Sequence, residues 1–93
     1  MKDKITKQKI KKYSDLTSTA LKQIKKNIIK ERESSAKEII EMAENYLSDA
    51  KYFEQTEDFV NAFAALNYAH GWIDSGVRLG IFNVKDDKLF TIK

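Results

Sequence analysis

The sequence predicts an all-α fold: an antiparallel three-helix up-and-down bundle with a short non-helical C-terminal tail. The 93 residues include no proline, and all three glycines fall within residues 71–80. Most of the chain therefore lacks a strong helix breaker. Apolar residues also recur at intervals of three and four, as they do on one face of a helix. A chain of this length makes one domain.

Charge divides the chain into a basic beginning and an acidic remainder. Residues 1–30 hold ten lysines and two aspartates, a net charge of +8, and residues 31–93 hold seven basic and twelve acidic residues, a net charge of −5. This asymmetry suggests either contact with nucleic acid or self-complementary association.

The chain has no cysteine. This excludes disulfides, thiol nucleophiles and cysteine-ligated metals, and it fits a reducing compartment. The N-terminus is polar and no long apolar run is present. We therefore expect a cytoplasmic protein with no signal peptide, no membrane span and no membrane partner.

The first helix is predicted within residues 13–30, which form the first part of a bundle spanning residues 13–80. Its start could be capped by Ser14, Asp15 or Thr17. Residues 1–12 are then a basic N-terminal extension, and the sequence leaves open whether they are helical.

The second and third helices are predicted from their capping residues. Ser35 and Glu38 have the spacing of a capping box, which places the start of the second helix there. Thr56 is the expected N-cap of a third helix from about residue 57 to residue 79, and Gly80 is the expected terminator. The short connection makes these two helices antiparallel neighbours. Residues 81–93 form the tail, expected to pack on the bundle or to pair with another chain.

The predicted core follows from the periodicity of the three helices. Its members are Leu16, Leu21, Ile24, Ile28, Ile39, Ile40, Ala43, Leu47, Phe59, Phe63, Leu66, Ala69, Ile73 and Val77.

The third helix carries the residues that could form a site. His70 and Asp74 are four residues apart, so their side chains can meet, and Asn67 and Arg78 extend the group. We interpret these four as a polar network that sets the register of the helix; the alternative is an oriented general base of a hydrolase. One histidine and one aspartate provide two ligands, so we predict no metal and no cofactor.

Small and aromatic residues mark the rest of the third helix. Ala64, Gly71 and Ser75 lie on one side, where close approach of another helix would compensate for the mid-helix glycine; contact with a ligand is the alternative. Tyr68 and Trp72 form a flank that covers a neighbouring helix or the tail, and they are candidate partner anchors if they stay exposed.

The basic N-terminal region supplies a different candidate surface. Its lysines could contact the phosphates of RNA or DNA, although lysines spread around a helix are also typical of a solvated face. The candidates are Lys7, Lys9, Lys11, Lys12, Lys22, Lys25 and Lys26.

Residues 58–82, DFVNAFAALNYAHGWIDSGVRLGIF, resemble the signature of a small archaeal family, the domain of unknown function 357. The order A-L-N-Y-A-H-G-W carries the resemblance. It implies a compact up-and-down helical bundle, and it carries over no catalytic residue because the family has no assigned reaction. The matching positions are Asn61, Asn67, His70, Gly71, Asp74 and Gly80.

These observations predict a non-enzymatic helical interaction module with a protein partner, and self-association is one form of it. An adaptor that binds RNA or DNA through the lysine-rich N-terminal helix is the alternative. A hydrolase centred on His70 and Asp74 is a third hypothesis.

Overall fold

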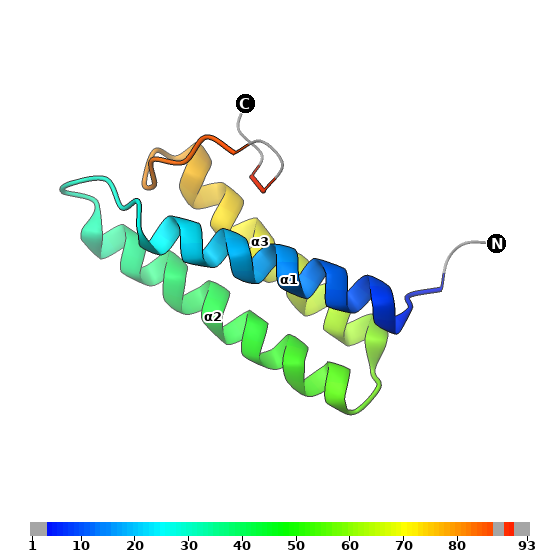
Figure 1. Ribbon diagram of the computed structural model, residues 1–93. Helices are drawn as coiled ribbons and strands as arrows, with labels where there is room; N and C mark the ends of the chain where they lie inside the picture. Colours follow the sequence, from blue (N-terminus) through cyan, green and yellow to red (C-terminus); the bar gives the residue numbers. More distant parts are fainter. Residues whose placement is uncertain (1–3, 87–88, 91–93) are drawn as a thin grey trace.

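The computed structural model describes residues 4–86, 89 and 90, and these form three helices packed as an antiparallel up-and-down bundle (Figure 1). Helix α1 spans Lys7–Lys25, α2 spans Glu33–Gln55 and α3 spans Phe59–Arg78. The α1–α2 connection lies at one end of the bundle and the α2–α3 turn at the other, so α1 and α3 run in the same direction (Figure 1). The predicted all-α three-helix fold is confirmed.

Helix α1 begins earlier than the periodicity of residues 13–30 indicates. Thr6 is its N-cap, and the Thr6 side chain accepts a hydrogen bond of 3.1 Å from the backbone N–H of Lys9. Ile10 is buried and anchors this first part of the helix in the core. Residues 7–12 are therefore helical, and the start predicted at Ser14, Asp15 or Thr17 is wrong because all three positions lie inside the helix.

Helix α1 also ends earlier, at Lys25. Ile28, predicted as core, lies beyond the helix and is 38% exposed, so that prediction is wrong. Ile28 instead forms an isolated antiparallel bridge with Phe82, and the N–H of Ile29 donates to the carbonyl oxygen of Ile81 over 3.0 Å. The α1–α2 connection and the segment after α3 thus satisfy each other's backbone groups.

Helix α2 begins at Glu33, so the capping box predicted at Ser35 and Glu38 is wrong. Arg32 occupies the cap position and makes no side-chain cap bond. The β-bridge between Ile28 and Phe82 fixes the α1–α2 connection. Glu31 then adopts a positive φ of 75°, which turns the chain into α2. An acidic residue in the first turn also interacts favourably with the positive end of the helix dipole.

The α2–α3 turn uses a different cap from the predicted one. Thr56 is the C-cap of α2, whereas Asp58 caps α3 by accepting a hydrogen bond of 3.3 Å from the N–H of Asn61. The prediction that Thr56 caps the third helix is therefore wrong by two residues. Asp58 takes the role because Glu57, at a positive φ of 60°, reverses the chain between them.

Helix α3 ends in the glycine motif that the sequence predicts. Gly80 has a φ of +74°, the left-handed conformation that favours glycine. The N–H of Ile81 donates to the carbonyl oxygen of Gly76 over 2.9 Å, and the N–H of Gly80 donates to that of Val77 over 3.2 Å. This pair of bonds is a Schellman motif, so the predicted terminator is confirmed.

The core consists of two clusters along the bundle. One lies beside the α2–α3 turn and is formed by Ile10, Ala50, Ala62, Ala65 and Leu66. The other lies towards the α1–α2 connection and is formed by Ala20, Leu21, Ile24, Ala36, Ile39, Ala43, Ile73, Ile81, Phe82 and Phe90.

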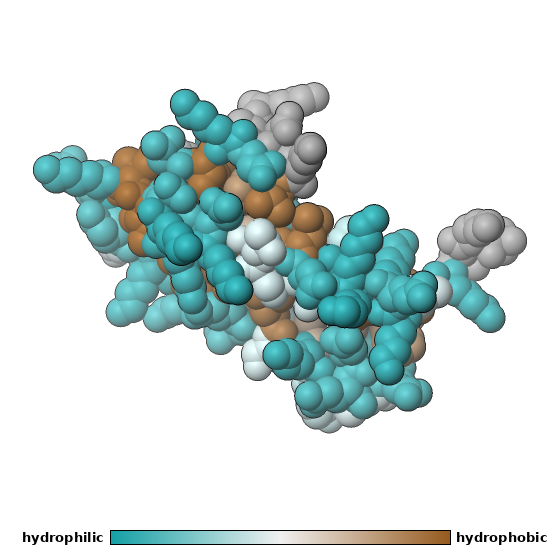
Figure 2. Space-filling model, viewed as in Figure 1, coloured by the Kyte–Doolittle hydropathy of each residue, from teal (hydrophilic) through white to brown (hydrophobic). Residues whose placement is uncertain are grey.

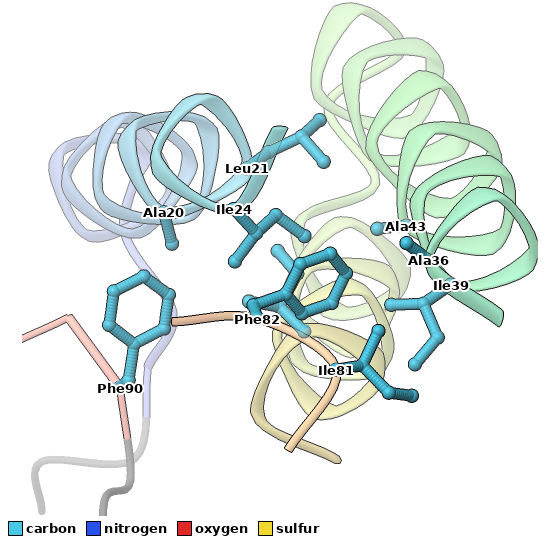
Figure 3. Packing of buried hydrophobic residues seen from close by; sticks show 10 residues of the cluster. Ala20, Leu21, Ile24, Ala36, Ile39, Ala43, Ile81, Phe82 and Phe90 are labelled. Atoms are coloured by element: carbon cyan, nitrogen blue, oxygen red, sulfur yellow. The ribbon is translucent and has the colours of Figure 1, made fainter. Parts of the chain in front are cut away.

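The segment after α3 supplies much of the second cluster. Ile81, Phe82 and Phe90 are each 3% exposed. Phe82 lies centrally among the side chains of that cluster, and Phe90 lies below Ala20 of α1 (Figure 3). Burying an aromatic side chain contributes about 1.5–3 kcal/mol, so this segment is a structural part of the bundle.

Most of the predicted core residues are buried or partly buried. Among those that remain partly exposed at the margins are Leu16, Ile40, Leu47, Phe59, Phe63 and Val77. They border the core because each lies at the edge of its helix's apolar arc.

Candidate functional site

His70 lies where α1, α3 and the segment after α3 meet. Its Nε2 lies 2.8 Å from the carbonyl oxygen of Leu89, and its Nδ1 lies 3.2 Å from the hydroxyl of Thr17. A carbonyl oxygen can only accept, so Nε2 carries a proton and donates to Leu89. In the neutral ring, Nδ1 then accepts from Thr17. Both ring nitrogens are engaged, so His70 ties together three segments that are distant in sequence.

Asp74 completes this contact on α3. Its Oδ1 lies 3.7 Å from Nε2 of His70, and both side chains are 22% exposed. The other two members of the predicted network do not join it: Asn67 and Arg78 are exposed, and within the described part of the chain neither makes a hydrogen bond to His70. The network of four is therefore corrected to His70 with Asp74, Thr17 and the Leu89 carbonyl.

Thr17 was missed as a member of this group. It is 2% exposed although it is polar. Its position between Tyr13 and Ala20 on the apolar face of α1 was the available signal, because a threonine there needs a partner when it is buried.

The outward face of α3 is the second feature of this helix. We define it as the exposed residues that follow one side of α3 and its cap: Val60, Ala64, Asn67, Tyr68, Gly71, Ser75 and Leu79. Val60, Tyr68 and Leu79 are 69%, 62% and 66% exposed. Arg78 is also exposed on this side, about five turns from Val60, and gives the face one charged side chain near its C-terminal end.

Gly71 lies at the centre of the outward face and packs against none of the described residues. A Cβ added there would meet no atom within 4 Å. The prediction that another helix packs closely against Ala64, Gly71 and Ser75 is therefore wrong within the chain, where all three are exposed. These three positions face outward, and α1 and α2 contact the other sides of α3.

The glycine that close packing requires is Gly76. A Cβ there would lie 2.5 Å from Cε2 of Phe82 and 2.9 Å from Cδ1 of Ile39. Real Cβ atoms do not approach carbon atoms so closely, so Gly76 lets Phe82 enter the core beside α3.

A groove runs along each side of the outward face. The groove between α2 and α3 has a volume of about 360 Å³, and its walls include Ile39, Tyr68, Trp72 and Leu79. The groove between α1 and α3 has a volume of about 270 Å³ and is more polar, with His70 and Asp74 on its walls. Asn67 and Gly71 line both grooves. Because Gly71 has no side chain, the helix surface is depressed where the two grooves meet, and we call this position the low point.

The two predicted anchor residues lie beside the groove between α2 and α3. Tyr68 is exposed and stacks on Tyr46 of α2, with ring centroids 5.3 Å apart and planes at 23°. Trp72 is half-buried and packs against the core cluster near the α1–α2 connection. The stacked Tyr46 and Tyr68 rings and the Trp72 indole thus provide aromatic surface beside Gly71.

The candidate phosphate contacts of α1 are all exposed. Hydrophilic side chains cover most of the face that includes α1 (Figure 2). Two of these lysines form ion pairs, Lys11 with Asp15 and Lys25 with Glu44 of α2, and Lys9 Nζ lies 5.1 Å from the ring centroid of Phe63. The lysines therefore form two groups, residues 7–12 and 22–26, at opposite ends of α1.

The three helices differ in charge. Helix α1 has six lysines and one aspartate, a net charge of +5, and α2 has six acidic residues and two lysines, a net charge of −4. In α3 the charges of Asp74 and Arg78 cancel, so the net charge is zero. The outward face of α3, on which Arg78 is the one charged residue, thus lies between a basic helix and an acidic helix.

Metal binding and membrane insertion find no support in the described residues. These residues contain no group of three or more His, Asp or Glu side chains placed to hold a metal ion. None of the helices described is long and apolar enough to cross a bilayer.

The fold and the outward face of α3 place the protein among small three-helix bundles with an open helix face. The family described as "Protein of unknown function (DUF357)" matches residues 12–82, and the chain belongs to this family. No curated protein and no solved structure matches the chain significantly. The family description assigns no activity, so the function must be argued from the site.

Proposed function

We propose that the chain is a non-enzymatic helical interaction module, and that the outward face of α3 is the surface on which a protein partner docks. The observation that carries the proposal is the open position of Gly71. A mid-helix glycine costs about 1 kcal/mol relative to alanine, and no contact with residues 4–86, 89 or 90 compensates for it. A partner that approaches the backbone closely at this point would compensate.

The exposed apolar side chains support the same surface. Val60, Tyr68 and Leu79 are each more than 60% exposed on one side of one helix, while the outer sides of α1 and α2 are charged. Helices commonly bind a partner helix in an apolar groove, with anchor side chains spaced at three, four and seven residues. The grooves beside Gly71 offer room for such anchors.

The location and source of the module belong to the same proposal. The absence of cysteine supports a reducing compartment, and we place the module in the cytoplasm. The resemblance of residues 58–82 to an archaeal signature supports an archaeal source.

The test uses two substitutions of similar size on different surfaces. Gly71→Leu fills the low point between the grooves, and Ser48→Leu adds the same side chain at an exposed position of α2. We expect the full chain and Ser48→Leu to recover the same partner from extract. Gly71→Leu should recover about tenfold less of that partner, or none. Equal recovery by all three folded proteins, checked by circular dichroism, would count against the proposal.

Binding of RNA or DNA through α1 is the second candidate, and the exposure of all seven candidate lysines favours it. Replacing Lys22 and Lys26, which lie together beside Thr19 and Gln23, by glutamine should weaken binding to single-stranded RNA and reduce its salt dependence. Binding that does not change, or no binding by the unaltered chain, would remove this candidate. The hydrolase hypothesis gains no support, because both ring nitrogens of His70 are engaged within the chain.

A further inference from the structure

We infer that the partner docked on the outward face of α3 is a second copy of this chain, and that the two α3 helices lie parallel about a two-fold axis. This inference rests on the proposed docking surface and names its occupant. The argument depends on the charges that flank the outward face on its two sides.

The flank on the α1 side is basic near the N-terminal end of α3. Lys9 lies over the Phe63 ring, with 5.1 Å from Nζ to the centroid. Lys12 is one turn further along α1, between Lys9 and Leu16, and Leu16 lines the groove between α1 and α3. Both lysines therefore border the outward face.

The flank on the α2 side is acidic at the same end of α3. Asp49 is exposed and lies one turn from Tyr46, whose ring stacks on Tyr68 of the outward face. Its neighbour Ala50 shares a core cluster with Leu66 of α3. Glu44, by contrast, faces away from α3 because it pairs with Lys25 of α1.

Symmetry decides which flanks meet when two copies dock face to face. A two-fold axis parallel to α3 places the α1 side of each copy opposite the α2 side of the other. Lys9 and Lys12 of one copy then face Asp49 of the partner copy, twice in the dimer. A two-fold axis perpendicular to α3 in the interface would bring the two α1 sides together and the two α2 sides together. At these flanks, opposite charges favour the parallel arrangement and like charges disfavour the other. The parallel arrangement also brings the two Arg78 side chains to the same level, which offsets part of this gain.

The centre of the face permits close contact in this arrangement. Ala64, Gly71 and Ser75 are small and exposed, so the two α3 backbones can approach, and Tyr68 provides a large side chain next to them. Helix α3 has 20 residues, a length of about 30 Å, and with its two grooves the face is about 20 Å wide. A docked copy covers on the order of 600 Å² per chain, which lies at the lower limit for a specific complex. We therefore expect a dimer that dissociates on dilution.

The first experiment measures mass against concentration by sedimentation equilibrium on the pure full chain. We expect the average mass to rise from one chain of 10.8 kDa towards two chains. Gly71→Leu should raise the dissociation constant at least about tenfold, and Ser48→Leu should leave it unchanged. A mass that stays at one chain, or a dimer equally stable in both variants, overturns the inference.

The second experiment tests the orientation by charge reversal. Lys9→Glu with Lys12→Glu, and separately Asp49→Lys, should each raise the dissociation constant by about threefold to tenfold. Mixing the two variants should restore dimers, since each contact then again joins opposite charges. Lys22→Glu with Lys26→Glu changes the net charge equally at the C-terminal end of α1 and serves as the control. Charge variants that dimerise like the control, or mixtures that do not recover, overturn the parallel dimer.

The two proposals fail in different ways. A chain that stays monomeric when pure, yet loses a different protein partner through Gly71→Leu, would keep the docking surface and reject the second copy as its occupant. If Gly71→Leu still self-associates and still binds a protein partner, the docking surface itself is rejected.

Discussion

Gly71 and Gly76 occupy the same helix within five residues of each other, and their surroundings are opposite. A Cβ at Gly76 would collide with Phe82 and Ile39, whereas a Cβ at Gly71 would meet no atom within 4 Å. The glycine at 76 is explained by the packing of this chain. The glycine at 71 has no such explanation in the part of the chain that the structure describes, which directs attention to a partner outside it.

The same contrast extends to the two sides of α3. The inward side holds Ile73 and Gly76, and at its edge His70 hydrogen-bonds to Thr17 and Leu89. Every buried side-chain nitrogen or oxygen atom within the described residues has a hydrogen-bond partner. The outward side is open, and Arg78 is the one charged residue described on it. One side of α3 therefore serves stability, and the other is available for binding.

Gly76→Ala tests the inward side most severely. The added methyl group must displace Phe82 or Ile39, and overpacking of this kind costs about 1–3 kcal/mol. Urea unfolding followed by the fluorescence of Trp72 measures the loss of unfolding free energy. An unchanged midpoint would mean that Phe82 does not pack against α3 as described.

His70→Phe tests the polar contact at the edge of the inward side. A phenyl ring takes the place of the imidazole, and the hydrogen bonds to Thr17 and Leu89 are lost. We expect a destabilisation of about 1–2 kcal/mol, because Thr17 is 2% exposed and its hydroxyl loses its partner. Urea unfolding of His70→Phe, Thr17→Val and the double variant measures whether the two effects add. The two substitutions should be non-additive, and additive effects would show that the two side chains are not coupled.

Gly71→Ala tests the outward side, and its expected effect is the smallest and of opposite sign. Alanine favours the helix over glycine by about 0.5–1 kcal/mol, and the new methyl group meets nothing in the chain. The unfolding free energy should rise by that amount at a concentration where the chain is monomeric. A destabilised variant would show that this surface is covered even in the single chain.

Several features of the fold could be predicted because they depend on local sequence. Helical periodicity located three helices, and Gly80 with its positive φ ended α3 where expected. Helix ends that depend on more distant segments were less accurate. The box at Ser35 and Glu38 did not start α2, because the connection before it is held by Phe82 and Ile81.

The candidate site could be predicted in part. The spacing of His70 and Asp74 correctly placed them in contact, since residues four apart meet on any helix. Asn67 and Arg78 have similar spacing, yet they point to the exposed side. The partners Thr17 and Leu89 are 53 and 19 residues away from His70, and no local pattern connects them.

Composition and periodicity were thus sufficient to specify an all-α bundle with a basic beginning and an acidic remainder. These properties follow from residues near one another in the chain. Which glycine is packed and which is open depends on Phe82, Ile39 and the side of α3 that they approach. Helical spacing lists the residues that share a side, but contacts between segments distant in sequence determine which side is buried and which is left for a partner.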